Sequence, residues 1–115
     1  ESPYNACKTA IINLTKCLSK AYSPQGIRIN CVSPAFIATP MTDAMMDQKA
    51  KKENISRKEA IQNFLKKERP GIVTDRQGKP EEVAAVIAFL CSAQADYVTG
   101  SNYRVDGGSV NTAFG

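Results

Sequence analysis

The sequence predicts an α/β protein in which helices pack on a small parallel sheet. Apolar residues recur at helical spacing in two segments, from Asn5 to Tyr22 and within GKPEEVAAVIAFLC. A short strand-like segment follows each of them, at residues 27–33 and in the stretch NYRVDGG. A strand, a helix and a second strand in this order favour a parallel pair joined by a right-handed crossover.

The first helix is predicted by the apolar positions Ile11, Leu14 and Leu18, with small residues near them that let another element approach closely. The stretch SPQG at 23–26 ends this helix, because proline and glycine do not comfortably continue it. Apolar and polar residues then alternate, which predicts a strand over 27–33 that a proline closes.

The segment from Thr39 to Pro70 predicts two short helices on a loop. Thr42 or Asp43 is a candidate N-cap for the first helix. Ser56 followed by Glu59 has the spacing of a capping box and marks the start of the second helix. This second helix is expected to bury three apolar residues, Ile61, Phe64 and Leu65.

The last helix begins at Pro80, a residue that suits a first helical turn. Glu81 and Glu82 complement the positive end of its dipole. Its expected buried stripe consists of Val83, Val86, Ile87 and Leu90. Gly100 then breaks the chain before the final strand, and Gly107 and Gly108 stop that strand.

Composition excludes several classes of protein. The 115 residues suffice for one small domain, and 43% hydrophobic residues can form a core. There is no apolar run of about eighteen residues, so we expect neither a membrane span nor a membrane partner. Histidine is absent and no CxxC occurs, so we expect no metal site. The four single cysteines favour buried, reduced thiols in a cytoplasmic protein: Cys7, Cys17, Cys31 and Cys91.

The net charge of +4 comes from one segment. Between Lys49 and Arg69, eight basic residues stand against three acidic ones. One interpretation is a solvated helical face, and the other is attraction for an acidic substrate or partner. Aromatic residues are not interleaved with these lysines as a stacking surface for nucleic-acid bases requires, so no nucleic-acid partner is expected.

Tyr4 and Lys8 are the candidate catalytic pair. Residues four apart lie on one face of a helix, and an ammonium about 5 Å away favours the ionised form of a phenol. Such a tyrosine can give a proton to a carbonyl oxygen as it becomes an alcohol, or take one in reverse. The alternative is a half-buried tyrosine beside a lysine that points into solvent.

Three stretches together resemble the short-chain dehydrogenase/reductase family, in order and at family-like separations. They are YNACK, GIRINCVSPAFIATPM and GKPEEVAAVIAFLCSAQADYVTGSNYRVDGG. The resemblance covers nearly the whole chain except residues 42–77. It implies the C-terminal half of a Rossmann-type, doubly wound parallel sheet, with its last two strands and their flanking helices. It also implies an NAD(P)-dependent oxidoreductase that interconverts a carbonyl and an alcohol in a small-molecule substrate.

The resemblance also assigns roles to residues. The tyrosine matching Tyr4 is the general acid/base, and the lysine matching Lys8 tunes it and binds the nicotinamide ribose. The loop from Pro34 to Thr39 matches the segment that lies along the nicotinamide. Ile37 is expected to use its backbone on the carboxamide, and Thr39 to hydrogen-bond the carboxamide or the pyrophosphate. The alternatives are a core-facing Ile37 and a Thr39 that caps the next helix.

Residues 41–70 correspond to the substrate lid. Met41, Met45 and Met46 are candidates for an apolar substrate pocket, with ordinary packing as the alternative. The family usually has Pro-Gly where this chain has Pro34-Ala35, and we expect the added methyl group to be tolerated. Helices and strands like those at 5–22 and 81–105 lie at subunit interfaces in the family, which implies a homo-oligomer, a dimer or a tetramer.

The family's glycine-rich phosphate loop, its selector between NAD and NADP and its catalytic serine all precede the tyrosine, and the chain contains no Gly-x-x-x-Gly-x-Gly. Residues 1–115 are therefore interpreted as the C-terminal part of a single domain whose N-terminal cofactor-binding half is absent. Either NAD or NADP is expected as the cofactor. The alternative is a noncatalytic fragment that retains only assembly interfaces.

Overall fold

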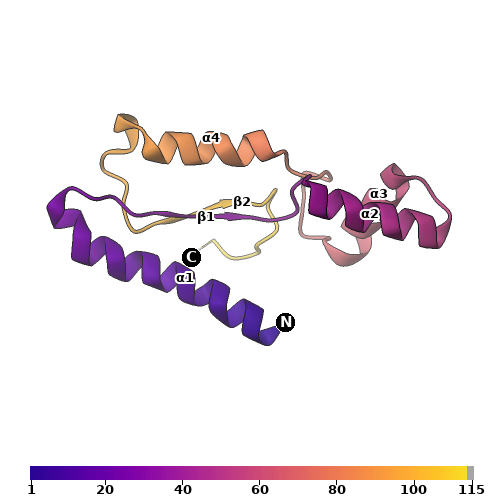
Figure 1. Ribbon diagram of the computed structural model, residues 1–115, viewed down its shortest axis with the longest axis horizontal. Coiled ribbons are helices and arrows are strands. Elements are labelled where there is room, and N and C mark those ends of the chain that lie inside the picture. The colour runs from indigo at the N-terminus through magenta and orange to yellow at the C-terminus, as the bar shows by residue number, and fades with distance from the viewer. Residues whose placement is uncertain (114–115) are drawn as a thin grey trace. The chain divides into compact units, whose positions relative to one another are not determined.

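The computed structural model describes residues 1–113, and the elements found there follow the predicted order (Figure 1). The helices are α1 (Ser2–Tyr22), α2 (Pro40–Glu53), α3 (Arg57–Glu68) and α4 (Pro80–Cys91). The strands are β1 (Cys31–Pro34) and β2 (Asn102–Val105). Two single 3₁₀ turns, η1 (Ser23–Gln25) and η2 (Ala93–Ala95), follow α1 and α4.

The chain divides into two compact units. The first unit comprises Glu1–Ser33 and Ala85–Arg104, and so contains α1 and most of α4 and of the two strands. The second unit comprises Pro34–Ala84 and the chain from Val105 onward, and so contains α2 and α3.

β1 and β2 form a two-stranded parallel sheet. The Cys31 N–H donates to the Ser101 carbonyl at 2.8 Å, and the Ala35 N–H donates to the Val105 carbonyl at 3.2 Å. Both strands therefore advance in the same direction, and the predicted parallel pair is confirmed.

β1 begins at Cys31, later than the predicted start at residue 27. In the preceding residues the Ile29 carbonyl accepts from the Gly100 N–H at 2.7 Å, but the next contacts involve side chains. The Ile29 N–H donates to Thr99 Oγ1 at 3.2 Å, and Asn30 Nδ2 donates to the Val98 carbonyl at 2.9 Å. Because these contacts interrupt a regular ladder, alternation of residue types alone placed the start of the strand too early.

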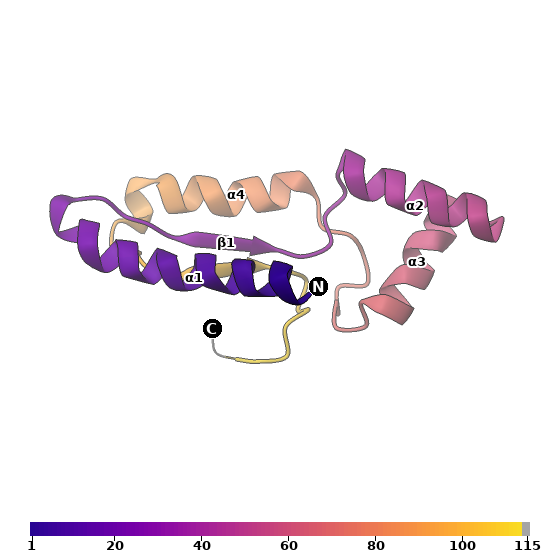
Figure 2. The same cartoon turned by 60° about the horizontal axis from the view of Figure 1, so that its bottom comes forward.

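Within the first unit, the strand pair lies between α1 and the C-terminal part of α4 (Figure 2). The residues that α1 buries are Thr15 and Ser19, and of the apolar positions that predicted this helix only Leu18 is partly buried. Ile11 is 48% exposed and Leu14 is 53% exposed. The spacing correctly predicted a helix, but the described residues include no element that covers this apolar stripe.

The buried stripe predicted for α4 is only partly formed. Leu90 is buried, Val83 and Val86 are partly buried, and Ile87 is exposed. The prediction that the cysteines are buried was wrong, whereas their free thiols agree with the predicted reduced state. Cys7, Cys17 and Cys91 are exposed, and Cys31 is partly buried.

The second unit has its own apolar core, formed by Phe36, Met46, Phe64, Leu65 and Ile72, with Ile61 partly buried against it. The Phe36 and Phe64 rings pack with centroids 4.7 Å apart. The predicted capping box at the start of α3 is present. Ser56 Oγ accepts from the Glu59 N–H at 3.1 Å, and the Glu59 carboxylate accepts from the Ser56 N–H at 3.3 Å.

The closing turn after β2 follows from its two glycines. Gly107 and Gly108 have φ values of +60° and +88°, in the left-handed region that side chains disfavour. The Gly107 carbonyl accepts from the Val73 N–H at 2.9 Å, and the Asp106 carboxylate accepts from the Gly108 N–H at 3.1 Å. The turn therefore ties the end of β2 to the segment after α3, as its structural interpretation requires.

Candidate active site

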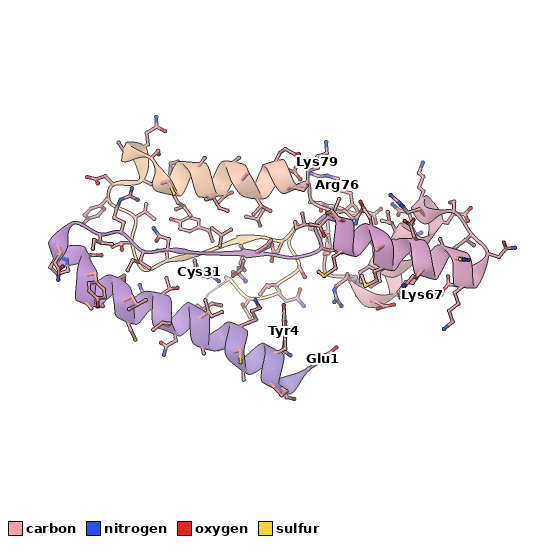
Figure 3. All side chains as sticks on the ribbon, viewed as in Figure 1. Glu1, Tyr4, Cys31, Lys67, Arg76 and Lys79 are labelled. Atoms are coloured by element: carbon pink, nitrogen blue, oxygen red, sulfur yellow. The ribbon has the colours of Figure 1, made fainter. Side chains whose placement is uncertain are left out.

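Tyr4 and Lys8 lie on one face of α1, at its N-terminal end. The Lys8 ammonium is 5.3 Å from the centroid of the Tyr4 ring, within the range of a cation–π contact. Tyr4 projects from the first turn and is 65% exposed (Figure 3). The pair is therefore assembled by the helix itself, and the phenol is open to a ligand. The half-buried tyrosine of the alternative interpretation is not what the structure contains.

Local sequence explains why α1 begins just before Tyr4. Pro3 lies in the first turn, where its missing N–H removes no helical hydrogen bond. The Asn5 N–H donates to the Glu1 carbonyl at 2.9 Å and so closes that turn. Between Ser2 and Tyr22 the helix contains no aspartate or glutamate, so no acidic side chain of α1 competes for the Lys8 ammonium.

The loop after β1 is anchored to a second segment. Ile37 forms an isolated parallel bridge with Gly78. The Gly78 N–H donates to the Phe36 carbonyl, and the Ala38 N–H donates to the Gly78 carbonyl, both at 2.9 Å. A Cβ on Gly78 would lie 2.6 Å from Ile37 Cδ1, so a glycine allows this close approach.

This bridge leaves the backbone of Ile37 accessible to hydrogen bonding. Its side chain is only 9% exposed, which matches the core-facing interpretation. Its carbonyl accepts from Thr42 Oγ1 at 2.6 Å, and within residues 1–113 its N–H donates to no protein group. A buried side chain and a backbone free to donate are compatible, so packing does not exclude a backbone contact with a carboxamide.

Thr39 is the N-cap of α2. Its hydroxyl accepts from the Thr42 N–H at 3.3 Å, and the Thr42 hydroxyl accepts from the Thr39 N–H at 2.8 Å. The prediction of Thr42 or Asp43 as the cap was wrong. Pro40 occupies the first helical position and holds the preceding residue in an extended conformation, which is the conformation that an N-cap needs.

Thr42 is the residue of this loop whose role sequence reasoning missed. Its hydroxyl contacts both Ile37 and Thr39, and so links the two predicted cofactor-binding residues. The spacing Thr39-Pro40-x-Thr42 could have revealed this role, because a hydroxyl three residues after an N-cap can return a hydrogen bond to it.

An ion pair fixes the turn that carries Gly78. Arg76 donates to both carboxylate oxygens of Glu82, at 2.9 and 2.7 Å, and the Lys79 N–H donates to Glu82 at 2.8 Å. These contacts lower the pKa of Glu82 to about 2, and the hydrogen bonds from Arg76 contribute the largest part of this shift. Glu82 therefore stays ionised at neutral pH and holds the turn in place.

Several charges of the 41–70 segment have side-chain partners, and others lie at helix ends. Arg57 donates to both oxygens of Asp47, which lowers the pKa of that carboxyl, and Lys49 pairs with Glu68 at 2.5 Å. Four lysines lie in last turns, where they complement the helix dipoles: Lys51 and Lys52 in α2, and Lys66 and Lys67 in α3. This arrangement favours the solvated-face interpretation of the basic segment.

The three methionines of the segment separate. Met46 is fully buried in the core, whereas Met41 is 78% exposed and Met45 is also exposed. Packing therefore accounts for Met46 alone. Met41 and Met45, four residues apart on α2, remain available to an apolar ligand.

The predicted site residues fall into two sets, one in each unit. Tyr4 and Lys8 belong to the first unit, and Pro34, Ile37 and Thr39 belong to the second. Thr42 brings Ile37 and Thr39 together, and Pro34 ends β1 just before them. Among residues 1–113, no cluster of cysteine and carboxylate side chains is arranged to hold a metal ion. No helix in that range has both the length and the apolar character needed to cross a bilayer.

The sequence model of a family described as "Enoyl-(Acyl carrier protein) reductase" matches residues 1–110. Dehydrogenase/reductase SDR family member 4 from Oryctolagus cuniculus is 41% identical over 107 residues. The chain belongs to the short-chain dehydrogenase/reductase family. A family member from Arabidopsis thaliana, a tropinone reductase homologue, is 40% identical over 113 residues.

These matches cover 93% and 98% of this chain but only 36% and 37% of the two relatives. The chain thus spans about a third of the length of the curated relatives it matches. Among solved structures, L-sorbose reductase from Gluconobacter frateurii, in complex with NADPH and L-sorbose, is 34% identical with a TM-score of 0.84. That likeness covers 95% of this chain and 40% of the other. The predicted α/β architecture, part of a Rossmann-type fold, is therefore confirmed.

Proposed function

We propose that this chain forms the C-terminal part of a single short-chain dehydrogenase/reductase domain that interconverts a carbonyl and an alcohol with NAD or NADP. The observation that carries the proposal is the Tyr4–Lys8 pair, exposed on one face of α1 with the ammonium 5.3 Å from the ring centroid. The named family members, which are reductases and dehydrogenases, and the NADPH complex of the sorbose reductase support it.

In this proposal Tyr4 handles the proton of the reacting oxygen. Its phenol donates a proton to the carbonyl oxygen during reduction and recovers one during oxidation. Lys8 favours the phenolate through its positive charge and hydrogen-bonds the ribose hydroxyls of the cofactor. The nicotinamide, when bound, supplies or accepts the hydride.

The loop from Pro34 to Thr39 would hold the carboxamide end of the cofactor. The Ile37 N–H, which has no protein acceptor in the described chain, can donate to the carboxamide oxygen. Thr39 Oγ1 accepts the Thr42 N–H and lies 3.1 Å from Thr42 Oγ1. Because the Thr42 proton is used on the Ile37 carbonyl, the Thr39 hydroxyl is the donor of this pair, and it would turn from Thr42 to donate to a ligand. These two donors fit the polar groups of a nicotinamide or a pyrophosphate.

Replacing Tyr4 by phenylalanine in the full-length protein tests the proposal. Tyr4→Phe is expected to abolish turnover while leaving cofactor affinity within a few-fold, because the ring remains and only the proton donor is lost. Lys8→Met is expected to impair both turnover and cofactor affinity, because it removes the charge and the ribose contacts. Turnover in Tyr4→Phe close to that of the unmodified enzyme would show that Tyr4 is not the acid.

A second candidate is a noncatalytic module that only assembles with other chains. The exposed apolar residues of α1 and α4 favour it, since Ile11, Leu14 and Ile87 have no cover among the described residues. Nicotinamide fluorescence separates the two candidates. An assembly module would form oligomers without quenching or enhancing NADH or NADPH emission, whereas the proposed enzyme, a homo-oligomer, changes that emission on binding.

A further inference from the structure

An open pocket of about 350 Å³ lies at the end of α1 opposite to Tyr4, wholly within the first unit. It is lined by Lys16, Ser19, Lys20, Ser23, Pro24 and Thr99. Two of these residues are cationic, three carry hydroxyl groups, and none is acidic. Tyr4 and Lys8 are not among them, so the pocket is separate from the proposed catalytic pair.

No carboxylate of its own helix neutralises the positive charge of the pocket. Lys16 and Lys20 are four residues apart on α1, so their side chains occupy neighbouring positions. The helix has no acidic residue, and the ion pairs found within residues 1–113 involve neither lysine. Two lysines that pair with no carboxylate in the described range therefore line one pocket.

Gly100 leaves the room that Lys16 needs in the wall of the pocket. It has a φ of +72°, and a Cβ at this position would overlap Ser19 Oγ and lie 3.0 Å from Lys16 Nζ. Ser19 Oγ donates to the Lys16 carbonyl at 2.8 Å. Ser19 thus binds the backbone carbonyl of Lys16, and the missing side chain of Gly100 leaves space for the Lys16 ammonium.

The hydroxyl groups add a donor that can be redirected. Ser23 Oγ donates to the Ile27 carbonyl at 3.1 Å and lies 2.9 Å from Thr99 Oγ1. Thr99 Oγ1 accepts from the Ile29 N–H at 3.2 Å. Because the Ser23 proton is used on Ile27, the Thr99 hydroxyl is the donor between the two side chains. The Thr99 hydroxyl can instead donate to an oxygen atom of a ligand, and only its hydrogen bond to Ser23 Oγ is then broken.

We propose that this pocket binds a small oxyanion with more than one negative charge, either free phosphate or the phosphoryl group of a phosphate monoester. The C-terminal end of a helix opposes an anion with about half a unit of negative charge, but two full ammonium charges outweigh it. Oxygen atoms of a phosphoryl group accept from both lysines and from the Thr99 hydroxyl at once, which a chloride ion does not.

Thermal unfolding and calorimetric titration of the full-length protein with inorganic phosphate test the proposal. Phosphate is expected to raise the Tm, whereas sodium chloride at equal ionic strength is not. The double variant Lys16→Gln, Lys20→Gln is expected to weaken phosphate affinity at least tenfold. The matched control, Lys51→Gln with Lys52→Gln, removes the same charge from the end of α2 and is expected to keep affinity within twofold.

A measurement on the unmodified protein tests the proposal even if the double variant does not fold. In lysine-labelled protein, phosphate is expected to shift the side-chain NMR signals of Lys16 and Lys20 more than those of Lys51 and Lys52. Titration with glycerol phosphate then separates the two sources: affinity equal to or above that for phosphate identifies a monoester, and weaker affinity identifies free phosphate. Equal effects of phosphate and chloride, or equal losses in both double variants, would overturn the proposal whatever the outcome for Tyr4.

Discussion

At the residue scale, Thr39 has two proposed duties that use different parts of one hydroxyl group. Its oxygen accepts the Thr42 N–H and caps α2, and its proton, which Thr42 Oγ1 accepts in this structure, is the part that would turn to a cofactor. The two alternatives of the sequence analysis are therefore not exclusive. They make different demands on the side chain, and substitutions can separate them.

Substitutions at Thr39 are expected to separate stability from cofactor binding. Thr39→Ala should lower the free energy of unfolding by about 1 kcal/mol, because it removes the cap. Thr39→Asp should keep the cap but lower cofactor affinity about tenfold or more, because a carboxylate has no proton to donate. Urea unfolding and nicotinamide fluorescence measure the two effects, with Thr39→Ser as the control that keeps both. Unchanged affinity in Thr39→Asp would restrict Thr39 to capping.

Glu82 gives the turn around Gly78 a defined response to acid. The pKa of Glu82 in the folded chain is about 2, below the ordinary value of 4.5, so its ion pair with Arg76 stabilises the fold fully above pH 4.5. That contribution is lost as the pH falls from 4.5 through 2. The Tm difference between the unmodified protein and Glu82→Gln is therefore expected to be constant above pH 5 and to shrink toward pH 2. Glu81→Gln, in the same turn but without an Arg76 contact, should not show this loss.

At the scale of elements, Arg28 joins the segment before β1 to the C-terminal end of α4. Its guanidinium donates to the carbonyls of Leu90, Ser92 and Ala95, at 2.6, 3.1 and 2.9 Å. These carbonyls lie at the end of α4 and in η2, where a helix leaves acceptors without backbone partners. One planar side chain therefore fixes how the last helix ends.

Arg28→Met is expected to lower the free energy of unfolding by about 2–4 kcal/mol, because it removes charged donors from three carbonyls. Arg28→Lys should recover only part of this loss, since a single ammonium does not reproduce the fork of a guanidinium. Asp96 lies 3.8 Å from Arg28 and is almost fully exposed, so Asp96→Asn should change stability by less than about 0.5 kcal/mol. Denaturant unfolding of the three variants measures whether their losses of stability follow this order. An Arg28→Lys protein as stable as the original would show that the forked geometry of the guanidinium is not needed.

At the scale of the whole molecule, the chain has little cover for its apolar elements. In the part of the chain that the structure describes, the sheet has two strands, and Ile11 and Leu14 of α1 are exposed. A sheet of this size is marginal by itself, and its unpaired strand edges favour association with other chains. The apolar core of the second unit, by contrast, is closed by its own helices.

Produced by itself, the chain of residues 1–115 is expected neither to bind NADH or NADPH tightly nor to turn over a substrate. The pyrophosphate of such cofactors is held by a glycine-rich turn at a helix N-terminus, and this sequence has no Gly-x-x-x-Gly-x-Gly. Fluorescence titration of a preparation verified by mass, beside the full-length protein, measures the difference. Micromolar binding by the short chain would mean that its own residues suffice for the cofactor.

The sequence by itself predicted the helices, the capping box of α3 and the pairing of Tyr4 with Lys8 on one helix face, because these depend on residues within one or two turns of each other. Tyr4 and Lys8 meet through helical spacing, Ser56 and Glu59 through the capping box, and Gly107 and Gly108 form a turn that only glycine adopts easily. Family motifs at matching separations added the fold class, which the comparisons confirmed.

Only the tertiary structure decided which faces are buried and which side chains serve as partners across the chain. Spacing shows that Ile11 and Leu14 share a helix face but not whether anything covers it, and the structure leaves both exposed. The Ile37–Gly78 bridge and the contacts of Arg28 join residues about 40 or more positions apart, and no local pattern specifies such pairs. Burial and long-range hydrogen bonds depend on what the rest of the protein brings alongside each segment.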